Sequence, residues 1–271
     1  MMVGVDPEFF AFSKAGKPIP AWKHFPKKEE KIKVGTDEGS ELGYGPSGWY
    51  FRDGYSLELN TPPETCRARM GNGIRATLKE ARRQLPEGSY ISTRATIRVN
   101  ERDLKSAPPD CQVFGCDPSY NAYTGKLFTV DLDAMEHPFR YAGGHLHVSG
   151  SVNSEFLESK KASFLFVKLC DLFIGLPFAY LYRTMDERMR RKYYGRAGEC
   201  RLQMYPGGVP GVEYRVPSPK VWNDHRIAIM FLGVIREVAS HFSDLAPAYN
   251  PAWDQPIQDA INTCNVPESM L

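Results

Sequence analysis

Alternating apolar and polar residues mark several stretches of the chain as strands, because successive side chains of a strand point to opposite faces. Clusters of glycine, proline and polar residues separate these stretches. The pattern predicts strands over residues 3–12, 54–60, 89–100, 143–150, 198–205 and 211–218, the last two joined by a turn rich in glycine and proline.

Apolar residues at helical spacing predict three helices. They span about Pro63 to Leu85, residues 154–182, and about Val221 to His241. The second has Asn153 or Ser154 as its N-cap, and we expect Pro177 to kink or split it.

The remaining stretches show neither the two-residue alternation of strands nor the spacing of helices. Residues 13–33 are predicted as an excursion or long hairpin loop, 35–48 as glycine-rich turns, 101–141 as irregular, and 245–271 as an irregular tail. The order of elements predicts an α+β fold, an antiparallel β-sheet with helices packed on one face. We expect a single domain of residues 1–271 in which one sheet collects the motif-bearing strands, with 13–54 and 101–141 as covering loops.

Composition excludes several classes of protein. A hydrophobic content of 42% supports a large core, and a net charge of only +2 does not indicate a nucleic-acid or membrane surface. No apolar run approaches the ~18 residues of a membrane helix, no Cys-x-x-Cys pair indicates structural zinc, and the N-terminus lacks the features of a signal peptide. We therefore expect a reduced, cytoplasmic protein.

Four of the predicted strands carry charged or metal-binding groups on one face and apolar residues on the other. Each strand taken alone also fits a solvated surface face, with paired acids, histidines or single glutamates exposed to water. The polar faces carry Asp6 and Glu8; Ser56, Glu58 and Asn60; His145, His147 and Ser149; and Glu213 and Arg215.

Together these four faces indicate a cation-binding sheet. Carboxylates gathered on one surface repel one another unless cations intervene. Mg²⁺ and Mn²⁺ take oxygen ligands, with histidine common for Mn²⁺, and arginine beside such ions suits phosphate oxygens. The pattern therefore suggests ATP chemistry.

Three motifs resemble those of glutamine synthetase-type ligases, in the same order. They are GVDPEFFAF, GGHLHVSGS and GVEYRVPS. The chain is more similar to the phage-associated carboxylate–amine ligases, the amidoligase branch of the glutamine synthetase and glutamate–cysteine ligase superfamily, which carry segments like FGCDPSYNAY, DGYSLELN and YYGRAGECR. The likeness covers most of residues 3 to 220 and implies a glutamine synthetase-like catalytic sheet, a partly open barrel.

The resemblance also implies roles for individual residues. Asp6, His145 and Glu213 would hold one metal ion, and Glu8 and Glu58 the other. His147, Ser149 and Arg215 would face the nucleotide, with Arg201 and Arg196 at the γ-phosphate or the substrate carboxylate; for these two arginines a surface salt bridge is the alternative. Asp6 stands where glutamine synthetase has glutamate. No residue matches the helper carboxylate of the first metal or the base for the amine; Asp53 and Asp117 are candidates, although both fit turns.

The implied reaction uses ATP and Mg²⁺ or Mn²⁺ to convert a carboxylate into an acyl phosphate, which an amine then attacks to form an amide or peptide bond, with release of ADP. Small-molecule or peptide acids and amines are the expected partners, in the host cytoplasm if the protein is phage-encoded. One alternative is another metal-dependent phosphotransferase on the same fold. The other is a non-enzymatic module in which the lysine-rich segment 23–33 binds nucleic acid or another polyanion, which the near-neutral charge argues against.

Overall fold

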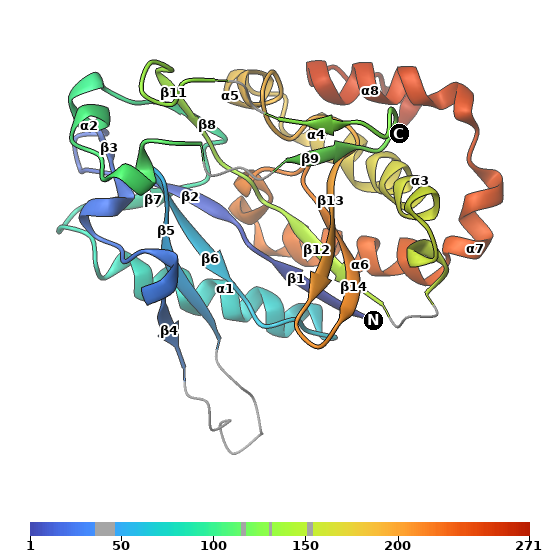
Figure 1. Cartoon of the computed structure of the whole chain (residues 1–271), viewed down its shortest axis with the longest axis horizontal. Coiled ribbons are helices and arrows are strands. Elements are labelled where there is room, and N and C mark those ends of the chain that lie inside the picture. The colour runs from blue at the N-terminus through green and yellow to red at the C-terminus, as the bar shows by residue number, and fades with distance from the viewer. Residues whose placement is uncertain (36–46, 115–117, 130–131, 151–153) are drawn as a thin grey trace.

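The computed structural model describes residues 1–35, 47–114, 118–129, 132–150 and 154–271 (Figure 1). The predicted N-cap Asn153, the candidate Asp117 and most of the glycine-rich turns at 35–48 lie outside these residues.

Two antiparallel sheets form a curled, half-barrel surface (Figure 1). The first runs in the order β1 (Met2–Val5), β12 (Leu146–Ser149), β14 (Val209–Tyr214), β13 (Glu199–Tyr205), β9 (Ser119–Asn121) and β10 (Leu127–Phe128). The second runs β3 (Pro18–Ile19), β2 (Glu8–Phe12), β6 (Ser56–Asn60), β5 (Gly48–Asp53) and β4 (Ile32–Val34), with β7 (Tyr90–Ser92) also paired to β2. A separate ladder joins β8 (Thr96–Arg98) to β11 (Phe139–Tyr141).

The prediction that one sheet collects all motif strands is wrong. The expected strand over residues 3–12 breaks at Asp6–Pro7, so that β1 pairs with β12 in one sheet and β2 pairs with β6 in the other. Pro7 has no N–H to donate to a ladder, which makes it a poor residue for the middle of a strand. The predicted strand over 89–100 divides in the same way into β7 and β8, which belong to different ladders.

Helices cover one side of both sheets, as predicted. Helix α1 (Arg67–Arg82) packs on β4, β5 and β6, α6 (His225–Ser240) packs on β1 and β12, and α3 (Lys160–Cys170) packs on β13 and β14. Because α1 and α6 also contact each other, a single apolar core runs behind both sheets. The α+β class and the antiparallel pairing are confirmed.

Several stretches predicted as irregular contain regular elements. The segment 101–141 holds α2 (Glu101–Lys105) and the strands β9, β10 and β11, and the predicted covering loop 13–54 includes β5, an interior strand of its sheet. The tail 245–271 forms α8 (Asp254–Thr263), and α7 (Phe242–Leu245) directly precedes most of it. Helix α8 buries Ile257, Ala260 and Ile261, a helical spacing that prolines close by in the sequence obscured.

The predicted helix over 154–182 is interrupted before Pro177, as expected. Helix α3 passes through a π-helical turn (Asp171–Gly175) into α4 (Leu176–Leu181), and the N-cap of α3 is Ser159 rather than Ser154. By length and mean hydropathy (1.8) the stretch Lys160–Leu181 is apolar enough to cross a membrane, although Lys168 and Asp171 interrupt its apolar run. In the fold 56% of that stretch is buried, which is the setting of a core helix. The short helix α5 (Met185–Arg190) was not predicted.

Asp171 in the π-helical turn ties this helix to the strands that carry the motifs. Its carboxylate is fully buried and accepts hydrogen bonds from the Tyr214 hydroxyl (2.7 Å), the Tyr123 hydroxyl (2.9 Å) and the Gly198 amide (2.6 Å). Burial nevertheless raises the pKa of Asp171 to about 7. Tyr214 lies between Glu213 and Arg215 on β14, and Gly198 precedes β13, so this network fixes the position of both strands.

We expect Asp171→Asn to lower the free energy of unfolding by about 2 kcal/mol or more, because the amide accepts at one oxygen only and turns its NH₂ toward donors. Urea denaturation at pH 8 measures the loss. Asp259→Asn, an exposed carboxylate on α8, is the matched control and should change stability by less than about 0.5 kcal/mol. Equal stability of the wild type and Asp171→Asn would show that the network does not hold the strands.

Candidate active site

Regular pairing brings three of the predicted residues into one row across the first sheet. His147 on β12 pairs with Glu213 on β14, and Glu213 pairs with Arg201 on β13. Paired residues of neighbouring strands share a face, so these three side chains are neighbours. Gly4 on β1 occupies the next position in the row, where it pairs with His147.

Asp6 reaches this row from the crossing between the sheets. The ligand-type atoms of Asp6, His147 and Glu213 lie within 4.8 Å of one another. His145, which directly precedes β12, places its Nδ1 3.1 Å from Asp6 Oδ1 and 3.4 Å from Glu213 Oε1. Asp6 and Glu213 are therefore flanked by both imidazoles of the GGHLHVSG motif, and we call these four residues the Asp6 cluster.

Glycines in the same motif permit this approach. A Cβ on Gly143 would lie 2.1 Å from His145 Nε2, and one on Gly144 would lie 2.4 Å from the Ser218 carbonyl oxygen. At Gly144 the contact is with backbone, so that position requires glycine, whereas a side chain at Gly143 would force the His145 ring to move.

The charges of the Asp6 cluster are stabilised by one another. Burial would raise the pKa of Asp6, but His147 and His145 hold it well below its ordinary value. Burial acts on Glu213 in the same direction and is outweighed by Arg215 and His145, so that its pKa is also lowered. The pKa of His145 is lowered by burial and by Arg215, whereas Asp6 raises that of His147 despite burial. Two ionised carboxylates at an imidazole pair are suited to a divalent cation.

A second group of carboxylates lies on the second sheet. Glu8 on β2 pairs directly with Glu58 on β6, and Asp53 lies at the end of the neighbouring strand β5. Glu8 accepts a hydrogen bond from the Gly143 amide (2.7 Å), and Glu58 accepts one from Asn60 (3.0 Å). We call Glu8, Glu58 and Asp53 the Glu8 cluster.

Each pKa in the Glu8 cluster is raised. Burial followed by the charge of Asp53 raises the pKa of Glu8 to about 8, and the same two causes raise that of Glu58 well above its ordinary value. Burial also raises the pKa of Asp53. Like charges directly opposite each other on neighbouring strands destabilise a fold unless a cation intervenes. Unlike the Asp6 cluster, this group lacks enough protein cations to balance it.

Arginines stand at the edge of the Asp6 cluster. Arg215 is buried and bonds to Glu213, and Arg201 Nη1 lies 3.4 Å from Glu213 Oε1. Gln203, not singled out by the sequence analysis, donates to the second oxygen of Glu213 at 2.7 Å. Arg196 points elsewhere, to the carbonyls of Arg191 and Lys192. Ser149 lies two residues beyond His147 on the same face of β12.

Tyr194 connects the two clusters and was missed by the sequence analysis. Its hydroxyl lies 2.7 Å from His145 Nε2 and 3.3 Å from Glu8 Oε1, and it accepts from Arg215 Nη2 at 2.9 Å. It belongs to the YYGRAGECR segment, but it lies outside regular strands, where no period assigns a face. Glu199 was missed as well; it lies 3.4 Å from Arg215 Nε.

Arg190 on α5 fixes the end of β14. Its guanidinium is fully buried and donates to the carbonyls of Arg215, Val216 and Pro217. Arg190 thereby holds the backbone carbonyl of Arg215, and Glu213 holds its side chain.

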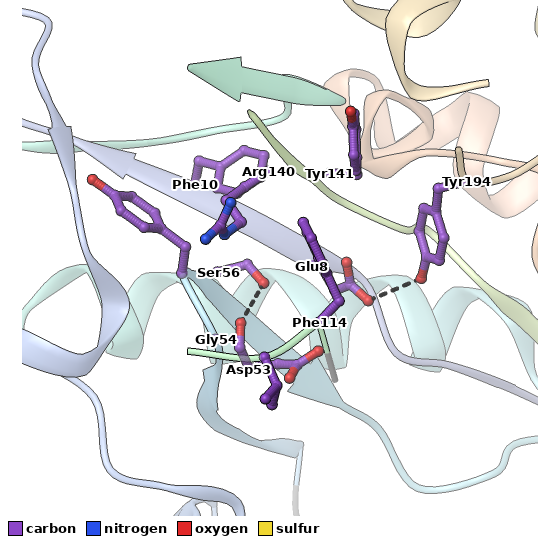
Figure 2. Close-up of a pocket in the computed structure, with 11 residues that line it drawn as sticks. Glu8, Phe10, Asp53, Gly54, Ser56, Phe114, Arg140, Tyr141 and Tyr194 are labelled. Atoms are coloured by element: carbon purple, nitrogen blue, oxygen red, sulfur yellow. Dashed lines mark hydrogen bonds between the residues drawn. The ribbon is translucent and has the colours of Figure 1, made fainter. Parts of the chain in front are cut away.

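A small pocket of about 50 Å³ opens beside Glu8 (Figure 2). Glu8 and Asp53 point toward it, and Tyr194 stands at one side. Its further walls include Phe114, Arg140 and Tyr141 from the segment predicted to cover the site. The space accommodates a few water-sized groups next to the acidic residues, and five of the eleven residues that line it are aromatic.

The donor atoms fit a divalent cation in both clusters. The Asp6 cluster offers two carboxylates and two imidazoles. Among the residues that the structure describes, the buried Nε2 of His147 has no hydrogen-bond partner, although it lies 3.0 Å from Asp6 Oδ1. The Glu8 cluster offers opposed carboxylates that repel each other. Carboxylate oxygens with imidazole nitrogen are the donor set of Mn²⁺, and carboxylates alone suit Mg²⁺.

Residues 130–262 match the family model described as "Phage phiEco32-like COOH.NH2 ligase-type 2". The match covers just under half of the chain. It includes both imidazoles, Glu213 and Arg215, whereas Asp6 and the Glu8 cluster lie N-terminal to it. The chain is thus similar to carboxylate–amine ligases in the region that supplies half of the site.

The other two comparisons do not assign the chain to a family. No curated protein matches the sequence. Among solved structures, the crystal structure of a bifunctional glutathione synthetase from Pasteurella multocida matches with a TM-score of 0.41 and 14% identity, over 99% of this chain and 45% of that one. The chain thus spans less than half the length of that protein.

Proposed function

We propose that this protein is an ATP-dependent carboxylate–amine ligase that forms an amide or peptide bond through an acyl phosphate. The observation that carries the proposal is that two acidic clusters meet at Tyr194, where buried Arg215 bonds to both Glu213 and Tyr194, an arrangement suited to phosphoryl transfer. The similarity of residues 130–262 to COOH·NH2 ligases supports the choice of an amine as the final acceptor. The motif resemblance to glutamine synthetase-type ligases points the same way.

The two clusters would hold two divalent ions, Mg²⁺ or Mn²⁺. Asp6, Glu213 and an imidazole, His147 or His145, would hold one, and Glu8 and Glu58 the other. When bound, such ions neutralise charge on the phosphates of ATP and draw the acceptor carboxylate toward them. Asp53, a candidate for the helper carboxylate that the motifs did not supply, influences both glutamates of the Glu8 cluster and would therefore serve the second metal ion, not the first.

Protein cations would act on the transferred phosphoryl group. Arg215, held rigidly by Glu213 and by the carbonyls that Arg190 fixes, would offset the negative charge that develops in transfer from ATP to the carboxylate. Arg201 would steady the γ-phosphate or the substrate carboxylate. Ser149 and whichever imidazole is not a metal ligand would face the nucleotide. Arg196 keeps its proposed substrate role only if it leaves the carbonyls it now binds.

The amine would then attack the acyl phosphate, losing a proton to a carboxylate, with release of phosphate. The aromatic walls around the Glu8 pocket would limit access of water to the acyl phosphate, which otherwise hydrolyses.

Hydroxylamine, a small amine that traps acyl phosphates as hydroxamates, tests this reaction. The purified protein with Mg²⁺ and ATP is incubated with a panel of carboxylic acids, and we expect hydroxamate, ADP and phosphate in equal amounts with the correct acid. An acid labelled with ¹⁸O in its carboxylate should pass one ¹⁸O to phosphate. Release of AMP, or a stable phosphorylated product, would contradict the proposal.

A further inference from the structure

The lysine-rich segment lies along the edge of β5. The 3₁₀ turn Lys28–Glu30 leads directly into β4, and the Arg52 amide of β5 donates to the Pro26 carbonyl at 2.8 Å. The segment therefore follows the same edge of β5 that β4 pairs with, next to the strand that ends at Asp53 (Figure 1).

Two lysines of this segment stand over the polar face of β5. Lys28 Nζ lies 5.7 Å from the centre of the Phe51 ring, and Lys31 Nζ lies 5.0 Å from that of Trp49. Phe51 pairs with Glu58, and Asp53 follows it on the same face. Lys28 is therefore over the face that carries the Glu8 cluster. Lys31 lies over the same face, but at Trp49, two residues further along β5 from Asp53 than Phe51 is.

Lys28 has no ion pair or hydrogen bond with any residue that the structure describes, while its neighbour Lys27 pairs with Glu30 at 3.5 Å. The ammonium group of Lys28 is exposed, and its charge works against burial in setting the pKa of both Asp53 and Glu58. Lys31 is not among the main influences on the pKa of either carboxyl. The charge of Lys28 thus lies close enough to influence Asp53 and Glu58 without an ion pair to either.

Cations face the Glu8 cluster from two sides. The charges of Arg215, which directly follows β14, and of Arg201 on β13 act on Asp53 from the first sheet, and the charge of Lys28 acts on it from the edge of β5. Once metal ions neutralise the carboxylates, all three would be available to an anion lying between them, and the compact ammonium of lysine suits a single oxygen.

We propose that Lys28 is a substrate-binding residue whose ammonium group contacts an anionic oxygen of a substrate, either a phosphate of ATP or the acceptor carboxylate, from the side opposite Arg215. This proposal rests on the proposed function. It gives the lysine-rich segment a role in the reaction without requiring nucleic acid.

Competitive lysine acetylation followed by mass spectrometry tests this contact in the unmodified protein. The acetylation rates of Lys28 and Lys31 are compared without ligand, with Mn²⁺ and the non-hydrolysable analogue AMP-PNP, and with Mn²⁺ and concentrated acetate. We expect ligand to slow acetylation of Lys28 about tenfold and to leave Lys31 nearly unchanged. Protection by AMP-PNP identifies the phosphate as the source of the oxygen, and protection by acetate alone identifies the carboxylate.

Variants give a second measurement. Lys28→Ala should weaken binding of the ligand that protects Lys28 about tenfold. The quantity measured is the Kd for AMP-PNP or, for a carboxylate contact, the KM of the acid. Lys28→Arg should restore part of it, and Lys31→Ala should have no effect. If wild-type protein binds AMP-PNP but neither ligand protects Lys28 and Lys28→Ala changes neither constant, the role of Lys28 is refuted and the proposed function stands. If wild-type protein binds no AMP-PNP with Mn²⁺, both proposals fail.

Discussion

Glu213→Gln is expected to lower the rate of ATP-dependent hydroxamate formation by about 10³-fold or more. Glu213 is 1% exposed and contacts Arg215, Arg201 and His145. It therefore links the proposed metal ligands to the proposed phosphate-binding arginine. Glutamine keeps the shape but removes the charge that binds a cation and orients Arg215. Loss of a single charge-stabilising group at such a centre typically lowers kcat by ~10²–10³, and loss of metal adds to it.

The rate is measured at saturating ATP and Mn²⁺, with Mn²⁺ affinity from calorimetry on the same samples. Glu237→Gln, an exposed glutamate on α6, is the matched control and should retain full activity. A Glu213→Gln protein that is folded, binds Mn²⁺ like wild type and keeps more than a tenth of its activity would show that Glu213 is not part of the catalytic centre.

Glu58→Gln is expected to stabilise the metal-free protein while abolishing its stabilisation by metal. Glu8 and Glu58 are buried opposite each other, and both have pKa values raised by burial and by neighbouring carboxylates. Glutamine needs neither a charge nor an added proton when it is buried at this position, and it keeps an oxygen for the Asn60 hydrogen bond. We expect a gain of about 2 kcal/mol in the free energy of unfolding at pH 8 in EDTA.

The pH dependence has a definite sign. Because the folded protein holds protons on Glu8 and Glu58 that the unfolded chain releases, the stability that these two groups contribute to metal-free wild type is fully present below about pH 4.5 and declines as pH rises through about 8. The advantage of Glu58→Gln should therefore be small at pH 4.5 and largest at pH 8. Added Mn²⁺ should stabilise wild type much more than the variant. Urea denaturation at both pH values checks this, and a variant less stable than wild type at pH 8 in EDTA would contradict it.

Regular strands explain why much of the candidate site was predictable. Because β12, β14 and β13 pair without a bulge in this region, the polar faces that the two-residue period assigned to His147 and Glu213 meet in the structure, and Arg201, which only the motif resemblance had indicated, joins them. The same period assigned Glu58 to the polar face of β6, and the structure pairs it there with Phe51 and Glu8. In these strands local alternation and tertiary contacts agree.

The sequence reasoning was wrong or silent where the backbone leaves regular structure. Asp6 reaches the His147 row only because the chain changes sheets at Pro7, which a continuous strand period does not describe. Tyr194 and Lys28 reach the site from outside the strands, so that no face could be assigned to them. Helix α8 was missed because its three buried residues stand among prolines that signal irregular chain.

Anomalous scattering at the manganese edge, from crystals grown with Mn²⁺ and AMP-PNP, tests whether the two acidic clusters bind metal ions. We expect two manganese peaks, one bound by Asp6, Glu213 and an imidazole and the other by Glu8 and Glu58, each about 2.2 Å from its ligand atoms. Nucleotide in the crystal with no manganese at either cluster would contradict it.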